Sequence, residues 1–208
     1  MSMNAKDDVE VLSRDTVFQG FYAVDRVRLR HRAFAGGWGR PIVREVLRTK
    51  SAVAVLPYDP VRDVVILVEE FRAGPFVAGD AVCWPYAVVA GMVEPGEALE
   101  DVARREAMEE AGCRLAGPIE HMFDYYPSPG CSSERVTLFC AQCNSSGLGG
   151  VHGLPQEGED IRVLPMVFDD ALDLLRRGAI KASPAIIALQ WLALNRADLR
   201  RRWSSKEA

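Results

Sequence analysis

The feature that most constrains this chain is a predicted helix at residues 98–111, because its apolar face carries carboxylates. On a helical wheel of about 100° per residue, the predicted buried stripe consists of Leu99, Val102, Ala103 and Ala107. Glu106 and Glu110 lie about 20° to either side of Leu99, in the middle of that stripe. Glu109 lies at the edge of the stripe, near −80° on the same wheel.

This arrangement is unfavourable unless a positive charge compensates it. Buried carboxylates cost several kcal/mol when unpaired, like charges four residues apart repel, and the C-terminal half of a helix disfavours anions. An ion-pair network from Arg104, Arg105 or Arg114 is one solution. The other is a hard divalent cation such as Mg²⁺, which prefers oxygen ligands. We favour the cation, since Arg105 projects toward Glu109 and away from most of the stripe.

The segments around this helix predict a mixed α and β architecture. Strand-like patterns occupy 51–56, 64–70, 87–90, 119–126, 134–143 and 161–167. Two further helices are predicted at 168–177 and 184–200, and a glycine-rich acidic loop at 145–160. Strands around a central helix, with helices at the end, indicate an α+β or mixed α/β sandwich and not a doubly wound sheet.

The N-terminal region predicts a separate small sheet. From Asp15 to Val46, apolar residues alternate with arginine and polar residues, interrupted by a glycine turn at 36–39. A sheet of about 45 residues is too small to be stable alone. We therefore expect it to pack against the main domain or a partner subunit.

Composition excludes several classes of protein. The 208 residues carry 25 Lys and Arg against 29 Asp and Glu, so a general nucleic-acid binder is not expected. Cys140 and Cys143 form one C-x-x-C without a second pair, which argues against a zinc site. His31, His121 and His152 are too dispersed for a nucleophilic triad. Without a signal peptide or a membrane-spanning run in the sequence, a cytoplasmic location is expected.

Specific spacing extends the pattern of the helix. Gly91, Glu97 and the run 105–113, REAMEEAGC, resemble the complete signature of the Nudix hydrolase family. Pro129, sixteen residues after Cys113, is similar in its position to the ADP-ribose pyrophosphatase subgroup. The resemblance implies an α/β/α sandwich with a mixed sheet for residues 49–208. It also implies that the β-domain at 1–48 takes part in dimerisation and substrate binding, and is exchanged across a homodimer.

The resemblance further implies roles for individual residues. The implied ligands of Mg²⁺, or of Mn²⁺ in its place, are the carbonyl of Ala90 and the carboxylates of Glu106, Glu109, Glu110 and Glu159. Glu157 is the implied general base, and Glu97 and Arg105 are the implied supporting residues, with Arg105 holding the ligating glutamates in place. The implied substrate-binding residues are Phe21 or Tyr22 on adenine, Arg44 of the partner subunit and Arg72 on phosphates, and Ser128 and Glu134 near the terminal ribose.

The implied activity is hydrolysis of ADP-ribose to AMP and ribose 5-phosphate. Ala87 departs from the family pattern, which commonly has glutamate there, and leaves the substrate choice open. A broader nucleoside-diphosphate-sugar pyrophosphatase, acting for example on GDP-mannose, is the main alternative. A non-catalytic ADP-ribose sensor is another, but the C-terminal segment 199–208 is too short for a DNA-binding appendage.

Overall fold

A computed structural model describes residues 3–204, and their contacts divide the chain into two units. Residues up to 51 together with 126–135 form the N-terminal unit. Residues 52–125 and those from 136 onward form the main unit.

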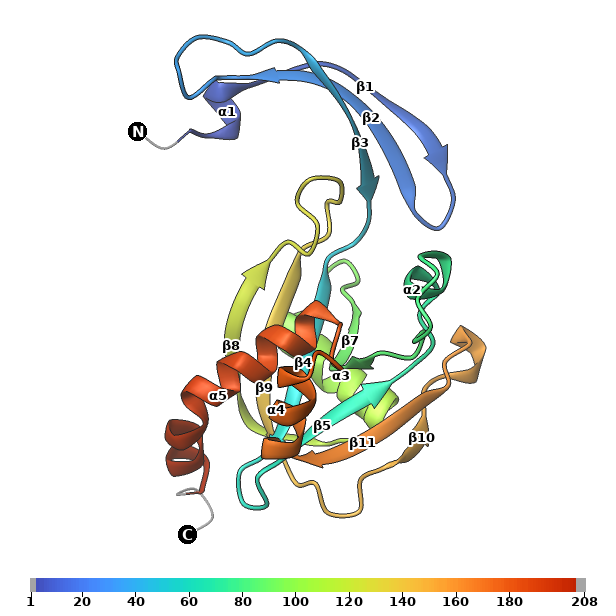
Figure 1. Ribbon diagram of the computed structural model, residues 1–208, viewed down its shortest axis with the longest axis vertical. Coiled ribbons are helices and arrows are strands. Elements are labelled where there is room, and N and C mark those ends of the chain that lie inside the picture. Colours follow the sequence, from blue (N-terminus) through green and yellow to red (C-terminus); the bar gives the residue numbers. More distant parts are fainter. Residues whose placement is uncertain (1–2, 205–208) are drawn as a thin grey trace. The chain divides into compact units, whose positions relative to one another are not determined.

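The N-terminal unit is built on one three-stranded antiparallel sheet (Figure 1). Its elements are α1 (Ala5–Asp8), β1 (Val9–Gln19), β2 (Ala23–His31) and β3 (Ile42–Arg48), with strand order β1-β2-β3. This confirms the predicted antiparallel sheet. The alternation from Asp15 did not predict the hairpin turn between β1 and β2. This turn is closed by the hydrogen bond from Gly20 N–H to the Tyr22 carbonyl at 2.8 Å.

This sheet has almost no interior of its own. Ala23 and Asp25 are its only buried residues among the described residues of the N-terminal unit. Asp25 accepts hydrogen bonds from Arg14 Nε at 2.9 Å, Thr16 Oγ1 at 2.8 Å and Arg48 Nε at 3.2 Å. Large apolar side chains are instead exposed, namely Met3, Val11, Leu12, Val17, Phe18, Phe21, Tyr22, Phe34, Trp38 and Val43.

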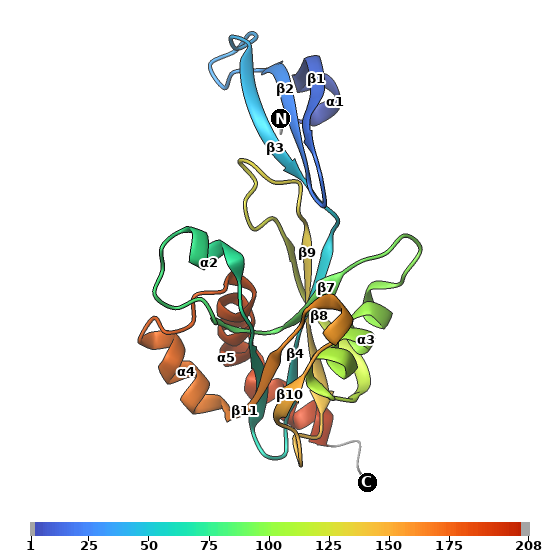
Figure 2. The ribbon, with the colours of Figure 1, turned by 90° about the vertical axis from the view of Figure 1, so that its right-hand side faces the viewer.

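The main unit is a mixed sheet covered by helices on both faces (Figure 2). Its strands are β4 (Ala52–Asp59), β5 (Val64–Glu69), β6 (Tyr86–Ala87), β7 (Val89–Met92), β8 (Leu115–Tyr125), β9 (Val136–Cys143), β10 (Gly150–His152) and β11 (Ile161–Val167). The path runs β10-β11-β5-β4-β9-β8, with β6 paired to β5 and β7 to β4. Only the β4–β9 pair is parallel among the pairings within this unit of the described chain.

The helices create two cores, one on each face of the sheet. Helix α3 (Leu99–Ala111) packs on one face, where Val53, Val55, Val68 and Phe139 are buried. Helices α4 (Phe168–Arg176) and α5 (Ser183–Ser204) cover the other face. The central strands β4 and β5 are apolar along nearly their whole length because both of their faces are buried. The α/β/α sandwich is thus confirmed.

Three local predictions need correction. The strand predicted at 51–56 continues to Asp59 because the Tyr58 side chain is fully buried in the core. A short helix, α2 (Ala73–Val77), was not predicted. The predicted loop at 145–160 contains strand β10 and a 3₁₀ turn, η1 (Pro155–Glu157).

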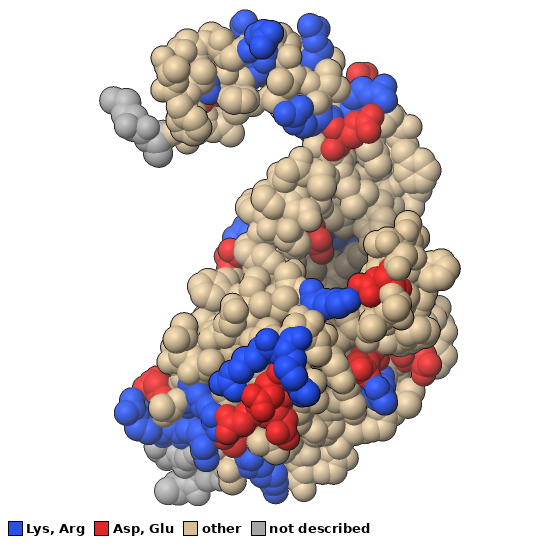
Figure 3. Space-filling view, viewed as in Figure 1, with Lys and Arg blue, Asp and Glu red and all other residues tan. Residues whose placement is uncertain are grey.

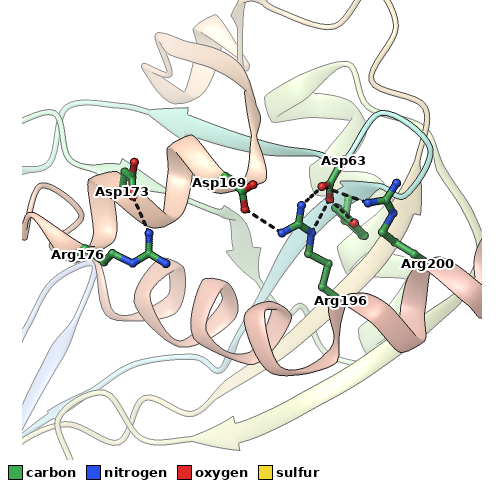
Figure 4. Close-up of polar contacts among 7 residues, drawn as sticks. Asp63, Asp169, Asp173, Arg176, Arg196 and Arg200 are labelled. Carbon is green, nitrogen blue, oxygen red and sulfur yellow. Dashed lines mark hydrogen bonds and ion pairs between the residues drawn. The ribbon is translucent and has the colours of Figure 1, made fainter.

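A partly buried turn residue, Asp63, ties α4 and α5 to the end of β4 (Figure 4). Asp63 adopts a positive φ of 60° in the β4–β5 turn and accepts a 2.6 Å hydrogen bond from Tyr58 Oη. Arg196 of α5 pairs with both Asp63 and Asp169, and its guanidinium lies 4.7 Å from the centre of the Phe168 ring. Acidic and basic side chains form mixed clusters on this face of the main unit (Figure 3).

In the part of the chain that the structure describes, none of the helices is both long and apolar enough to cross a membrane.

Candidate active site

Helix α3 forms where the sequence predicted it and carries the carboxylates inward. Its first turn contains Glu100 and Asp101, which favour the positive end of the helix dipole. It ends at Gly112, whose φ of +57° is left-handed. The buried stripe begins at Val102, and Leu99 is 38% exposed, so its predicted place in the stripe is wrong. Leu99 is the first residue of the helix, and the packed positions start one turn later.

Glu106 and Glu110 are both buried on this face, as predicted. Glu110 is 4% exposed, and its Oε2 accepts a hydrogen bond from Ala90 N–H of β7 at 3.0 Å. Among the described residues Glu110 makes no ion pair. Burial, reinforced by the charges of Glu106 and Glu70, raises the pKa of Glu110 to about 8, although the Ala90 hydrogen bond and the charge of Arg72 oppose the shift. The helix therefore holds a buried carboxylate that its surroundings only partly compensate.

Arg105 neutralises the other carboxylates. One guanidinium contacts Glu106 Oε1 at 2.7 Å, Glu109 Oε2 at 3.1 Å and Glu97 Oε1 at 3.5 Å. Burial still raises the pKa of Glu106, although Arg105 opposes that shift. Arg104, the other candidate cation on the helix, bonds to the backbone carbonyls of Leu115 and Gly117 instead. The ion-pair alternative is thus correct for Glu106 and Glu109, and it does not extend to Glu110.

A glycine on β7 makes room for the Glu106 carboxylate. A Cβ added at Gly91 would lie 1.7 Å from Glu106 Oε1 and 2.0 Å from Glu106 Cδ. No other residue fits at this position without moving the glutamate. Gly91 is therefore needed to let the α3 carboxylates lie directly against the backbone of Ala90 and Gly91.

The distant acidic loop contributes Glu159 to the same region. The negative charge of Glu159 adds to the raised pKa of Glu106 and of Glu70, which places it near both carboxylates. Its Oε2 accepts a hydrogen bond from Leu154 N–H at 2.8 Å. Glu157, by contrast, is exposed on η1 and has no hydrogen bond or ion pair to the α3 carboxylates in the described structure.

Sequence reasoning missed Glu70 at this site. Arg72, which it did predict, forms an ion pair with Glu70 at 2.7 Å, Nη2 to Oε2. Burial raises the pKa of Glu70, Arg72 opposes the shift and Glu159 adds to it. Because Ala87 pairs with Val68 in the β5–β6 ladder, Glu70 falls on the same face, diagonal to Ala87. The available signal was the run VEEFR, which ends a buried strand with two carboxylates and an arginine.

The remaining predicted residues belong to the N-terminal unit. Phe21 is 83% exposed, contacts Tyr22 edge to face at 4.9 Å, and lines a hollow of about 240 Å³ with Arg48 and Lys50. Arg44 is exposed on β3. The carbonyl of Ser128 accepts hydrogen bonds from the next turn of backbone, and Glu134 N–H bonds to Ser132 Oγ at 3.1 Å. These four residues therefore belong to a different unit from the α3 carboxylates.

The donor set fits a hard divalent cation. It consists of buried or half-buried carboxylates beside the backbone of Ala90 and Gly91, and Glu110 forms no ion pair among the described residues. The side chains do not converge into a finished shell, since no group of three Asp, Glu, His or Cys in the described chain is arranged to hold a metal ion. Arg105 holds two of the carboxylates, and Leu154 N–H holds a third.

The fold and the carboxylate helix identify the class of this protein. Residues 48–183 match the family model of the NUDIX domain, and the chain belongs to the Nudix hydrolase family. Over 199 residues it is 39% identical to an ADP-ribose pyrophosphatase of Escherichia coli strain K12, covering 96% of this chain and 94% of the relative. The ADP-ribose pyrophosphatase of Haemophilus influenzae is 39% identical over 201 residues, covering 96% and 92%.

A further relative and a solved structure also match this chain. A GDP-mannose pyrophosphatase of Cronobacter sakazakii is 34% identical over 151 residues, covering 73% of this chain and 78% of the relative. A solved structure described as an ADP compounds hydrolase has a TM-score of 0.70 at 22% identity, covering 94% of this chain and 96% of that one. This last likeness supports the fold.

Proposed function

We propose that this Nudix hydrolase is a metal-dependent ADP-ribose pyrophosphatase that releases AMP and ribose 5-phosphate. The observation that carries the proposal is Glu110, a buried carboxylate with a pKa raised to about 8 and no ion pair in the described chain. A functional cation explains why such an unfavourable group is kept there. The substrate is supported by the two ADP-ribose pyrophosphatases that match over almost the whole chain.

The proposed cation site uses the residues that surround Glu110. Glu106, Glu109 and Glu159 supply carboxylates, and Ala90 supplies its carbonyl. Bound Mg²⁺, or Mn²⁺ in its place, would polarise the diphosphate and offset its charge. Arg105 orients Glu106 and Glu109, because its guanidinium contacts both.

The proposed reaction is attack of water on a phosphorus of the diphosphate. The water oxygen bonds to phosphorus while Glu157 accepts a proton from the water. The bond from that phosphorus to the bridging oxygen breaks. The exposed position of Glu157 on η1 leaves it accessible to water and substrate. Arg72 contacts the phosphates, which requires that Glu70 share its guanidinium.

The N-terminal unit is proposed to complete the site of a second copy in a homodimer. In this arrangement, Arg44 of the partner subunit binds phosphate and Phe21 stacks on adenine, while Ser128 and Glu134 lie near the terminal ribose. The nearly coreless sheet supports a covering partner, since its apolar side chains are otherwise exposed. Charge supports it too, because residues 1–51 carry ten Lys and Arg against six Asp and Glu, and the rest of the chain 15 against 23. A cytoplasmic location is proposed as well, supported by five free cysteines.

The experiment compares nucleotide sugars as substrates. Purified protein is incubated with ADP-ribose or GDP-mannose in Mg²⁺, in Mn²⁺ and in EDTA, and the products are separated by chromatography. The proposal predicts AMP and ribose 5-phosphate, a higher kcat/KM for ADP-ribose, and no turnover in EDTA. Faster hydrolysis of GDP-mannose would favour the second candidate, which the Cronobacter relative supports. Reaction in H₂¹⁸O identifies the attacked phosphorus.

A further inference from the structure

His152 lies where the acidic loop meets the end of α3. It is the last residue of β10, and it pairs with Ile161 at the start of β11. Directly after it the chain turns at Gly153, whose φ is +101°, and reaches Glu159 through η1. His152 is therefore the last sheet residue before the loop that carries Glu157 and Glu159.

The ring of His152 packs against the residue that ends the carboxylate helix. A Cβ added at Gly112 would lie 2.8 Å from Cε1 and 3.3 Å from Nδ1 of His152. The imidazole thus occupies the space that a side chain at Gly112 would need. Gly112 is also left-handed, so this position favours glycine for both its backbone and its neighbour.

A backbone hydrogen bond fastens the next residue to the same helix. Gly153 N–H donates to the carbonyl of Glu109 at 3.2 Å. That carbonyl belongs to the last turn of α3, where carbonyl groups have no partner within the helix. The loop therefore caps the helix that carries the candidate cation ligands.

A second hydrogen bond fixes the ring itself. His152 Nε2 lies 2.9 Å from the carbonyl oxygen of Gly149. A carbonyl only accepts, so Nε2 carries the proton and donates it. The ring is thus held by Gly149 at Nε2 and rests on Gly112 at the adjacent Cε1.

The fastened segment supports Glu159 directly. Leu154 N–H donates to Glu159 Oε2 at 2.8 Å. A Cβ added at Gly153 would lie 2.6 Å from Glu159 Cβ, so the backbone of Gly153 touches the glutamate. A shift of residues 152–154 would therefore move Glu159.

We propose that His152 is a positioning residue that locks the acidic loop onto the end of α3 and thereby fixes the position of Glu159. This rests on the proposed function only for the role of Glu159 in hydrolysis. His152 itself touches neither the reacting atoms nor the carboxylates. Its effect on the reaction passes through Gly153, Leu154 and Glu159.

The test uses His152→Ala, His152→Gln and the control His121→Ala. Gln keeps an N–H donor near the place of Nε2 but lacks the ring, whereas Ala has neither. His121 is a half-exposed histidine on β8 of the same unit, and none of its contacts involves the loop. Circular dichroism and thermal melting show whether each variant is folded.

Two readouts separate positioning from general stability. The first is kcat and KM with ADP-ribose, where His152→Ala is expected to lower kcat about tenfold and to change KM less than about twofold. The second is amide hydrogen exchange of Gly153 and Leu154 without metal or substrate, where both amides are expected to exchange at least about tenfold faster. His152→Gln is expected to fall between Ala and wild type, and His121→Ala to match wild type.

Unchanged kcat and unchanged exchange at Gly153 in a folded His152→Ala protein would overturn the proposal. A His152→Gln protein no better than Ala would overturn the part assigned to the hydrogen bond with Gly149. If wild-type protein fails to hydrolyse ADP-ribose, the proposed function fails, whereas amide exchange still decides whether His152 locks the loop.

Discussion

The two units of this molecule differ most in how they bury their residues. The main unit has a core on each face of its sheet, with Leu138, Leu189 and Phe139 among the buried side chains. The N-terminal unit buries Ala23 and Asp25 alone among its described residues. A unit without a core cannot be stabilised by its own packing. Only the main unit therefore has the buried core that an independently stable fold needs.

The two units also differ in the groups that hold their most buried aspartates, Asp59 in the main unit and Asp25 in the N-terminal unit. In the main unit, Asp59 accepts hydrogen bonds from the backbone N–H groups of Val61, Arg62 and Ser145, and from the Ser145 hydroxyl at 2.7 Å. In the N-terminal unit, Asp25 depends on side chains, and those of Arg14 and Arg48 are 59% and 47% exposed. Backbone N–H groups supply most of the hydrogen bonds to Asp59, beside one from the Arg62 side chain at 3.1 Å, whereas Asp25 is held by side chains alone among the described residues.

The largest expected effect comes from Glu110→Gln in the main unit. If Glu110 binds the cation, kcat falls at least about a hundredfold, because the amide cannot replace a charged ligand. The steady-state rate with ADP-ribose in saturating Mg²⁺ is the measurement. Arg44→Ala in the N-terminal unit serves as the comparison, and it is expected to raise KM more than it lowers kcat. Equal activity of Glu110→Gln and wild type would contradict the assignment.

The same substitution is expected to stabilise the metal-free protein. Because the pKa of Glu110 is raised to about 8, the folded state binds more protons than the unfolded state between about pH 4.5 and 8. Stability of the wild type therefore falls as the pH rises through this window. At pH 8 in EDTA, Glu110→Gln should be more stable by about 2 to 4 kcal/mol in urea unfolding. A variant that is less stable than wild type at pH 8 would show that the carboxylate is already neutralised.

The next effect compares apolar positions in the two units. Leu138 of β9 is fully buried, so Leu138→Ala should lower the free energy of unfolding by about 3 kcal/mol. Val17 of β1 is 44% exposed, so Val17→Ala should change it by no more than about 0.5 kcal/mol in the isolated chain. Urea unfolding at several protein concentrations measures both values. A large, concentration-independent loss for Val17→Ala would mean that the N-terminal sheet has a core within one chain.

The smallest expected effect is the difference between Asp59 and Asp25 in how strongly each makes the stability of the fold depend on pH. Burial alone would raise the pKa of Asp59, but the donors from Arg62 and Ser145 lower it to about 2. Such a group stabilises the fold above the unfolded pKa near 3.8, and this contribution of about 2 kcal/mol is lost as the pH falls from about 4 to about 2.

Hydrogen bonds from Arg14 and Thr16 lower the pKa of Asp25 in the same direction. Asp59→Asn should therefore remove more of the acid dependence of stability than Asp25→Asn does. Thermal melting between pH 2 and pH 6 provides the comparison. A larger change for Asp25→Asn would reverse the ranking of the two units.

The sequence predicted well the features that local residue patterns determine. Two glutamates on an apolar helical face required compensation, and the structure shows Arg105 on Glu106 and no ion pair at Glu110 among the described residues. The alternation in the N-terminal region predicted antiparallel strands, which the β1-β2-β3 sheet confirms. Both arguments depend only on neighbours in the sequence.

Features that depend on distant contacts were not predictable in this way. Glu70 joins the site because β6 pairs with β5 and Glu159 lies nearby, neither of which is visible in the run VEEFR. A role for His152 is not visible in the sequence, since its contact with Gly112 joins residues 40 positions apart. Leu99 fits the apolar stripe on a helical wheel, but a wheel does not show which turns of the helix are buried. Leu99 lies in the first turn of α3 and is exposed.

We propose that the chemistry belongs to the main unit of one subunit while the N-terminal unit of its partner helps to bind the substrate. The most direct test of this proposal co-refolds equal amounts of Glu110→Gln and Arg44→Ala proteins and measures hydrolysis at low ADP-ribose. In an exchanged dimer, half of the mixed pairs' sites combine an intact Glu110 with an intact Arg44, so activity should recover to about a quarter of wild type. Activity no higher than the average of the two variants would contradict the account, because each site would then be built from a single chain.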